Sequence, residues 1–244
     1  MRQRLILSLQ HFLKRRYNKE IVAIKDPFRD MRLLVAGFEV LGVVDGGAYH
    51  GEIAKRLQQV FPTARVYAFE PATSAFATLK QEVNENPYIK PIKLALSSHG
   101  GKSVLYLNAQ DSTNALSLVS DEGERYQSWQ TQNLAKEEIE LCTLDVWLRE
   151  NDAKRIDVIK LDLQGHELEA LRGAKGVLQS TVKLIYIEVE FVRIYQENCL
   201  LHEIVGFLEE IGFTLYQLYN LTSGEDGQIV CGDALFVHRD RLQF

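Results

Sequence analysis

The chain has 244 residues, a formal net charge of −5, 46% apolar and 25% charged residues. This is the composition of an ordinary globular domain with some additions, and the acidic balance argues against a general nucleic-acid binder. Three cysteines without a CxxC spacing, Cys142, Cys199 and Cys231, argue against a disulfide framework or a zinc site and favour a reducing, cytoplasmic setting.

Residues 1–39 are expected to form a helical extension ahead of the main domain, residues 40–244. Apolar residues recur there at helical spacing among basic ones; they are Leu5, Ile6, Leu9, Phe12 and Leu13. No stretch approaches the roughly 18 apolar residues of a membrane span, and the start lacks the apolar core of a signal peptide. Packing of this helix on the domain and a homodimer formed through it both stay open, while attachment to a membrane surface is the less favoured alternative.

From residue 40 onward, apolar strands alternate with amphipathic helices. The expected strands are 40–45, 65–70, 89–97, 157–163 and 183–190, and the expected helices are 49–60, 73–85, 167–178 and 202–211. Further extended pieces are expected at 102–108 and 138–143, and the tail predicts a hairpin of 214–221 and 234–239 around a glycine turn. The pattern predicts a Rossmann-like α/β fold, whose mostly parallel sheet is covered on both faces and ends in a C-terminal antiparallel hairpin.

The longest irregular stretch, residues 109–137, is rich in Ser, Gln, Asn and Glu. Long loops inside a compact domain are usually functional or disordered. We expect this loop to be a lid over a substrate site.

The first strand ends in a glycine-rich turn, where sheets of this kind bind ligands. The turn reads Asp45-Gly46-Gly47-Ala48-Tyr49-His50-Gly51. The dinucleotide pattern GxGxxG does not fit it, which disfavours a nicotinamide dehydrogenase. An acidic residue beside this turn would repel a pyrophosphate and would suit the cationic amino group of a methionine moiety.

Later strand ends carry further polar residues. Glu70, followed by Pro71, stands 25 residues after Asp45, where an acid can accept hydrogen bonds from ribose hydroxyls. Leu96 and Ser97 close the third strand, where an adenine could lie.

Asp162 interrupts an apolar strand where a reacting group would sit, with His166 and Glu190 as further candidates for acid–base work. A helix-capping role for Asp162 and a surface position for His166 stay open. Metal assistance through Asp162 and Glu190 is conceivable, but no ligand spacing demands a metal.

These residues together resemble the FkbM family of methyltransferases over about residues 40–238. The resemblance rests on the segments VVDGGAYHG, YAFEP, IKLDLQGHELEALRGA and GDALFVH. It implies a class I methyltransferase fold, S-adenosylmethionine as the cofactor and a hydroxyl of a sugar or natural product as the acceptor. It also implies that Asp45, Gly47 and Gly51 hold the methionine end, that Glu70 binds the ribose and that Asp162 stands near the methyl group.

Two positions depart from the family pattern. Tyr49 stands where the family usually has Asn, and Gln164 stands where it usually has Glu. The expected function is O-methylation of a small-molecule or glycan acceptor. The alternatives are N-methylation and a cofactor-binding protein without catalysis.

Overall fold

The computed structural model describes residues 16, 25–127, 133–151, 153 and 155–242. The apolar residues of the expected N-terminal helix lie outside the described residues. The described part of that extension includes the helix α2, Pro27–Leu34, which Asp26 caps by accepting a hydrogen bond from the Phe28 N–H. Phe28 and Met31 are buried against the main domain.

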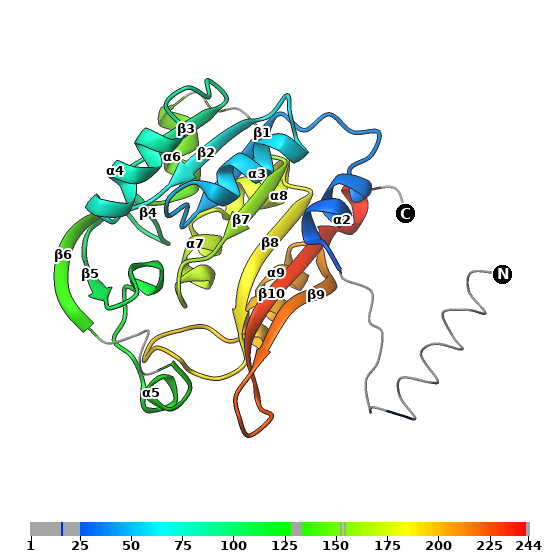
Figure 1. Ribbon diagram of the computed structural model, residues 1–244. Coiled ribbons are helices and arrows are strands. Elements are labelled where there is room, and N and C mark those ends of the chain that lie inside the picture. Colours follow the sequence, from blue (N-terminus) through cyan, green and yellow to red (C-terminus); the bar gives the residue numbers. More distant parts are fainter. Residues whose placement is uncertain (1–15, 17–24, 128–132, 152, 154, 243–244) are drawn as a thin grey trace.

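A seven-stranded sheet forms the centre of the molecule (Figure 1), in the order β3-β2-β1-β7-β8-β10-β9. The bounds are β1 Gly42–Gly46, β2 Arg65–Phe69, β3 Ile89–Ile92, β7 Val158–Leu161, β8 Leu184–Glu190, β9 Phe213–Ser223 and β10 Ile229–His238. The first five strands in this order pair in parallel, and β10 runs antiparallel to both of its neighbours. The expected parallel sheet with a C-terminal antiparallel hairpin is therefore confirmed.

Helices cover both faces of this sheet because successive residues of a strand point to opposite sides. On β1, Val43 belongs to one buried cluster with α2, α3 and α4, whereas Val44 belongs to the other with α6, α7, α8 and α9. These helices are α3 Glu52–Val60, α4 Thr73–Glu82, α6 Leu144–Glu150, α7 Glu167–Arg172, α8 Lys175–Ser180 and α9 Leu201–Glu210. Both clusters reach the strands that carry the site, so the site stands on a packed core.

A second, three-stranded sheet lies beside the first (Figure 1), in the order β4-β6-β5. Its strands are β4 Ala95–Leu96, β5 Gly101–Asn108 and β6 Asn133–Cys142. The single strand expected over 89–97 is therefore wrong: the chain leaves the main sheet after Ile92, and β4 pairs with β6 instead. β6 also begins earlier than the expected extended piece at 138–143.

Two other expectations about the helices need correction. The helix expected over 167–178 is two short helices that break around Gly173, where a Cβ atom would lie 2.0 Å from the carbonyl oxygen of Ser97. The stretch 109–137 is not wholly irregular, since it holds a 3₁₀ turn at Asp111–Thr113, the helix α5 at Asp121–Gln127 and the start of β6.

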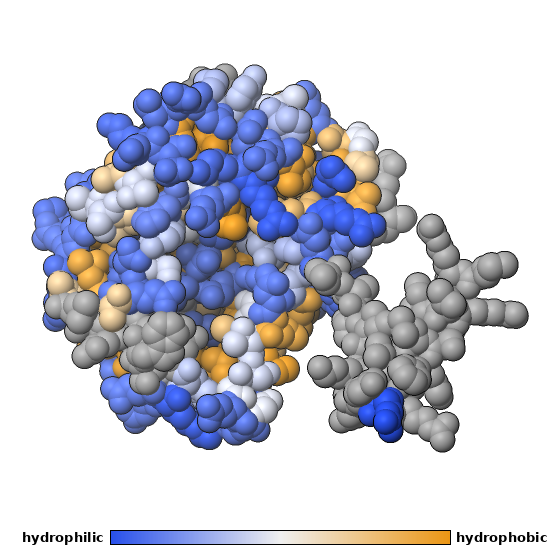
Figure 2. All heavy atoms as spheres, viewed as in Figure 1, coloured by the Kyte–Doolittle hydropathy of each residue, from blue (hydrophilic) through white to orange (hydrophobic). Residues whose placement is uncertain are grey.

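Polar side chains cover most of the face shown in Figure 2, with scattered apolar groups between them, as is usual for globular proteins. None of the helices that the structure describes is long and apolar enough to cross a lipid bilayer.

Candidate active site

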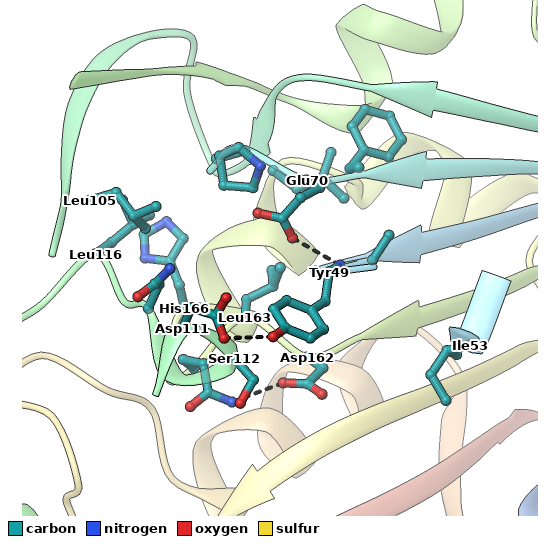
Figure 3. A pocket seen from close by; sticks show the side chains of 18 of the residues that line it. Tyr49, Ile53, Glu70, Leu105, Asp111, Ser112, Leu116, Asp162, Leu163 and His166 are labelled. Carbon is teal, nitrogen blue, oxygen red and sulfur yellow. Dashed lines mark hydrogen bonds between the residues drawn. The ribbon is translucent and has the colours of Figure 1, made fainter. Parts of the chain in front are cut away.

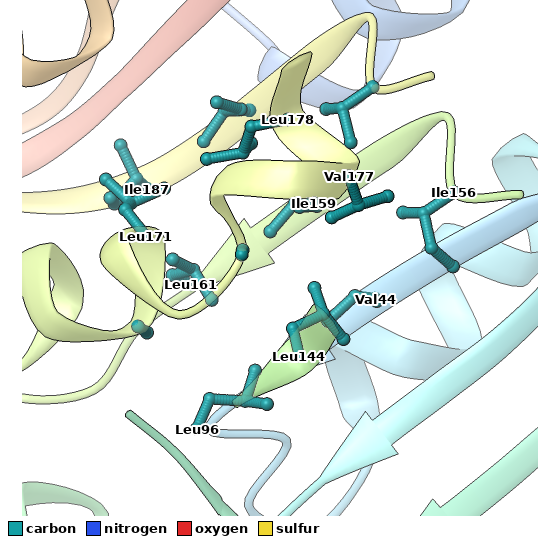
Figure 4. Packing of buried hydrophobic residues seen from close by; sticks show 14 of the residues in the cluster. Val44, Leu96, Leu144, Ile156, Ile159, Leu161, Leu171, Val177, Leu178 and Ile187 are labelled. Carbon is teal, nitrogen blue, oxygen red and sulfur yellow. The ribbon is translucent and has the colours of Figure 1, made fainter. Parts of the chain in front are cut away.

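A pocket of about 990 Å³, counting its open mouth, lies at the carboxyl ends of β1, β2 and β7 (Figure 3). Its walls come from the turn after β1, the end of β2, the segment 94–96, the segment 111–116 and the turn after β7. Its lining combines apolar side chains with a few polar groups, as is typical of pockets that hold cofactors and small substrates. Leu96 and Leu161 belong to the large buried cluster beside it (Figure 4), and Leu96 itself lines the pocket.

The turn after β1 needs glycine for two reasons. Gly47 has a φ of +69°, a conformation that other residues rarely adopt. A Cβ atom on Gly47 would also lie 1.8 Å from the carbonyl oxygen of Asp162. Gly51, with a φ of +88°, precedes α3 and would press a Cβ against the Leu79 side chain at 2.7 Å. The sequence therefore brings two backbone segments close together at the rim of the pocket.

Asp45 lies beneath this turn, fully buried, and forms an ion pair with Lys160. The two residues are direct neighbours in the pairing of β1 with β7, so both side chains emerge on one face of the sheet. The Lys160 ammonium is 3.1 Å from Asp45 Oδ1 and also donates to the carbonyl oxygens of Gly46 and Gly47, at 3.3 and 3.0 Å. Burial raises the pKa of Asp45 although Lys160 acts in the opposite direction. The buried ion pair thus holds the backbone of the glycine turn in place through the Lys160 ammonium.

Glu70 stands at the end of β2 and is buried, with its carboxylate at the pocket. Its two oxygens accept hydrogen bonds from the backbone N–H groups of Tyr49 and Ala72, both at 2.9 Å. These bonds tie the end of β2 to the turn after β1. Each carboxylate oxygen keeps a further lone pair for a ligand hydroxyl.

Asp162 is half-buried at the end of β7, lines the pocket and lies 3.9 Å from the Lys160 ammonium. His166 lines the same pocket, and its Nε2 lies 3.0 Å from the Ser97 hydroxyl. Burial lowers the pKa of His166, which favours a neutral imidazole. Glu190 is buried away from the pocket, and burial together with the nearby Glu167 raises its pKa well above the ordinary value.

The structure brings together most of the site residues expected from the sequence. Those that line the pocket are Gly47, Ala48, Tyr49, Glu70, Pro71, Leu96, Asp162 and His166. Those that do not line it are Asp45, Gly46, Gly51, Ser97 and Glu190.

Several lining residues were missed. Lys160 was a visible signal, because a lysine inside the apolar run Ile159 to Leu161 must find a partner when it is buried. Asp111 and Asn114 also line the pocket, and both lie in the segment 109–137 that is expected over a substrate site. The individual contact that was missed is the hydrogen bond of 2.5 Å that Asp111 accepts from the Tyr49 hydroxyl. Nothing in the sequence of that loop indicates this contact.

Among the residues that the structure describes, no three His, Cys, Asp or Glu side chains are grouped so as to hold a metal ion. The polar groups of the pocket are instead arranged singly along the strand ends, which suits an organic ligand with several hydrogen-bonding groups.

Comparison with known proteins agrees with this geometry. Residues 45–215 match the model of the methyltransferase FkbM domain. The chain is 24% identical over 173 residues to the 2-O-methyltransferase NoeI of Sinorhizobium fredii, covering 68% of this chain and 70% of that protein. It is 26% identical over 196 residues to the methyltransferase sdnD of Sordaria araneosa, covering 71% of this chain and 73% of that one. It is 28% identical over 127 residues to the hexuronic acid methyltransferase AglP of Haloferax volcanii, covering 52% of this chain and 47% of that one.

The fold has a solved counterpart in the methyltransferase FkbM from Methylobacillus flagellatus KT, with a TM-score of 0.53 and 17% identity. That match covers 88% of this chain and 48% of the other, so this chain spans about half the length of the solved one. The family match extends from the glycine turn to the start of β9 and includes Glu70, Asp162 and the turn that follows Asp162. The chain therefore belongs to the FkbM methyltransferase domain family.

Proposed function

We propose that this chain transfers the methyl group of S-adenosylmethionine to a hydroxyl group of a sugar or natural-product acceptor. One observation carries the proposal: a glycine turn, a buried carboxylate and a half-buried carboxylate converge on one pocket from three neighbouring parallel strands. These are the ends of β1, β2 and β7, where Gly47, Glu70 and Asp162 stand.

The residues present fit this cofactor. The missing side chain of Gly47 lets the turn pack directly against the backbone carbonyl of Asp162, which sets the shape of the turn that the ligand meets. Glu70 would accept hydrogen bonds from the ribose hydroxyls, and the apolar side chains of Leu96 and Leu163 would contact the adenine. When bound, the cofactor supplies a methyl group activated by a positively charged sulfur.

Asp45 would act on the methionine end indirectly, because Lys160 already pairs with it beneath the turn. Lys160 holds the carbonyl groups of Gly46 and Gly47 in place and so fixes the conformation of the turn that the ligand meets.

Asp162 would orient the acceptor and receive its proton. As the acceptor oxygen takes the methyl group from the sulfur, the Asp162 carboxylate would take up the proton of the acceptor hydroxyl. A positioned base of this kind raises the reaction rate roughly 10²–10⁴-fold. His166, neutral and hydrogen-bonded to Ser97, is the second candidate for this proton. Glu190 would contribute through its effect on neighbouring carboxylates, since it does not line the pocket.

Two relatives support a sugar hydroxyl as the acceptor, since one is named a 2-O-methyltransferase and the other a hexuronic acid methyltransferase. The test is transfer of a labelled methyl group from S-adenosylmethionine to matched acceptor pairs, such as methyl glucoside and methyl glucosaminide. We expect the labelled methyl group on a hydroxyl oxygen. Label confined to the amine would point to N-methylation, and tight binding of NAD without binding of S-adenosylmethionine would refute the proposed cofactor.

A further inference from the structure

Carboxylates gather at the carboxyl ends of β7 and β8. Lys160 and Tyr186 are paired in the parallel register, so the register brings the next residue on the same face of each strand, Asp162 and Glu188, opposite each other. Asp233 of β10 is paired with Glu188 on the other side. Two carboxylates this close repel each other unless a donor stands between them.

Gln164 supplies that donor. Its amide Nε2 lies 2.9 Å from Asp162 Oδ1 and 2.9 Å from Glu188 Oε2. An amide nitrogen carries two N–H bonds, and a carboxyl oxygen without a proton accepts, so one N–H can serve Asp162 and the other can serve Glu188. A glutamate at this position would have no donor for either of them.

Tyr195 fixes which way the amide points. Its hydroxyl lies 2.8 Å from Gln164 Oε1, so the amide oxygen faces the tyrosine and the nitrogen faces the carboxylates. The backbone supports the same arrangement, because Gln164 has a φ of +54° and the next residue, Gly165, has a φ of +92°. A non-glycine residue in this conformation is strained, so the surrounding contacts must hold it.

We propose that Gln164 is a positioning residue that clamps Asp162 and Glu188 side by side at the edge of the pocket. The inference rests on the proposed methyl transfer, in which Asp162 receives the acceptor proton. The clamp keeps the Asp162 carboxylate aimed at the pocket while a second carboxylate stands behind it. Glu188, and not only Glu190, then belongs to the machinery of the site.

The groups around Glu188 determine in which direction its pKa should shift when Gln164 is replaced. Burial, followed by the carboxylates of Asp162, Glu167 and Glu190, raises the pKa of Glu188 well above the ordinary value. The groups facing Glu188 are Lys160 and Asp162 from β7 and its turn, Glu167 from α7, Glu190 from its own strand, Asp233 from β10, and Tyr195. Loss of the Gln164 N–H removes a bond that favours the ionised carboxylate, so it raises the pKa of Glu188 further.

The first experiment needs neither cofactor nor acceptor. The carboxyl carbons of glutamate are labelled with ¹³C, and the Glu188 signal, assigned from Glu188→Gln, is followed against pH by NMR. Gln164→Asn keeps an amide but shortens the side chain by one methylene, so it cannot reach both carboxylates. Tyr195→Phe leaves the amide in place and frees it to rotate. We expect Glu188 to titrate at a higher pH in Gln164→Asn than in the wild type, and to shift in the same direction in Tyr195→Phe.

Gln164→Glu adds a charge as well as removing the donor, and its matched control is Gln196→Glu at an exposed position of the neighbouring loop. Gln164→Glu should shift the Glu188 titration furthest, and Gln196→Glu should leave it near the wild-type value. An unchanged Glu188 titration in Gln164→Asn would overturn the clamp, and if that variant does not fold, Tyr195→Phe decides in the same way.

The second experiment compares the binding of S-adenosylmethionine and S-adenosylhomocysteine, which differ by one methyl group and by the positive charge that it gives the sulfur. If the clamp aims Asp162 at the pocket, Gln164→Asn should lower the preference for the charged ligand at pH 8, by no more than the few-fold change expected when Asp162 itself loses its charge. An unchanged preference would also contradict the clamp. Failure of the wild-type protein to bind either ligand would refute the proposed function instead, and the NMR titration would still decide the clamp.

Discussion

Burial raises the pKa of Glu70 to about 7, although the backbone N–H groups of Ala72 and Tyr49 and the Lys160 ammonium act in the opposite direction. Because the folded protein holds this proton more tightly than the unfolded chain, the contribution of Glu70 to the free energy of unfolding falls as the pH rises from its ordinary value to about 7. A ligand whose hydroxyls donate to the ionised carboxylate would restore part of this lost stability.

We therefore expect the affinity for S-adenosylmethionine to rise roughly tenfold between pH 6 and pH 8, since the ionised fraction of Glu70 rises by that factor around its pKa. Glu70→Gln should bind more weakly at pH 8 and lose most of this pH dependence. Titration calorimetry at three pH values measures both. A wild-type affinity that does not change with pH would show that the ribose is bound elsewhere.

Asp162 decides between an enzyme and a protein that only binds the cofactor. Asp162→Asn keeps the shape of the side chain, so cofactor affinity should stay within a few fold. The single-turnover rate should fall roughly 10²-fold or more if Asp162 accepts the proton. The helix-capping role that the sequence left open for Asp162 is wrong, because His166 is the N-cap of α7 and no side chain among the described residues caps that helix. If Asp162 takes no part in proton transfer, the rate of Asp162→Asn would barely change. Asp121→Asn, at an exposed position of α5, is the matched control.

The turn after β1 is the element that tolerates least change. In Gly47→Ala the new Cβ atom would meet the carbonyl oxygen of Asp162 at 1.8 Å, and the φ of +69° would be strained as well. The variant should lose cofactor binding and unfold at a lower temperature. Gly206→Ala in α9 is the control, because open space surrounds that position and alanine favours a helix by roughly 0.5–1 kcal/mol. Equal melting temperatures and affinities for Gly47→Ala and the wild type would contradict this account of the turn.

Elements with a strong pattern could be predicted from the sequence, and those set by long-range contacts could not. The strands ending at Asp45, Glu70 and Asp162 were visible as apolar runs that stop at a polar residue. The helix α6 was missed, although Thr143 caps it by accepting a hydrogen bond from the Val146 N–H. The departure of the chain from the main sheet after Ile92 depends on the distant pairing of β4 with β6, which no local pattern reveals.

The same limit applies to the site. The residue types at the strand ends were readable, but their partners depend on the register between strands, which only the folded sheet defines. Asp45 was expected to meet the ligand, yet the register sets it against Lys160. From the sequence, Gln164 indicates only that a carboxylate usual in the family is absent. The structure shows that its amide is hydrogen-bonded to Asp162 and Glu188.

Over the whole molecule, the segment 109–137 connects the small sheet to the pocket. Its described part places Asp111, Asn114 and Leu116 in the pocket lining, and the Val119–Tyr195 bridge joins it to the loop after β8. We propose that this segment is a lid that closes over the acceptor. It touches the cofactor turn through the hydrogen bond from Tyr49 to Asp111.

Tyr49→Phe removes that bond while keeping the aromatic ring, which stacks on His50 at 3.7 Å between ring centroids. A hydrogen bond of this kind contributes about 0.5–1.5 kcal/mol, so opening of the lid should become roughly 2–12 times more frequent. Limited trypsin digestion reads this out at Arg125 in α5, where the variant should be cut faster than the wild type. Tyr216→Phe, on the exposed side of β9, should be cut at the wild-type rate.

S-adenosylmethionine and an accepted glycoside together should slow cleavage of the wild type, because a closed lid shields the peptide bond after Arg125 from the protease. Equal cleavage of Tyr49→Phe and wild type, with and without ligands, would mean that the segment is a fixed wall of the pocket rather than a lid.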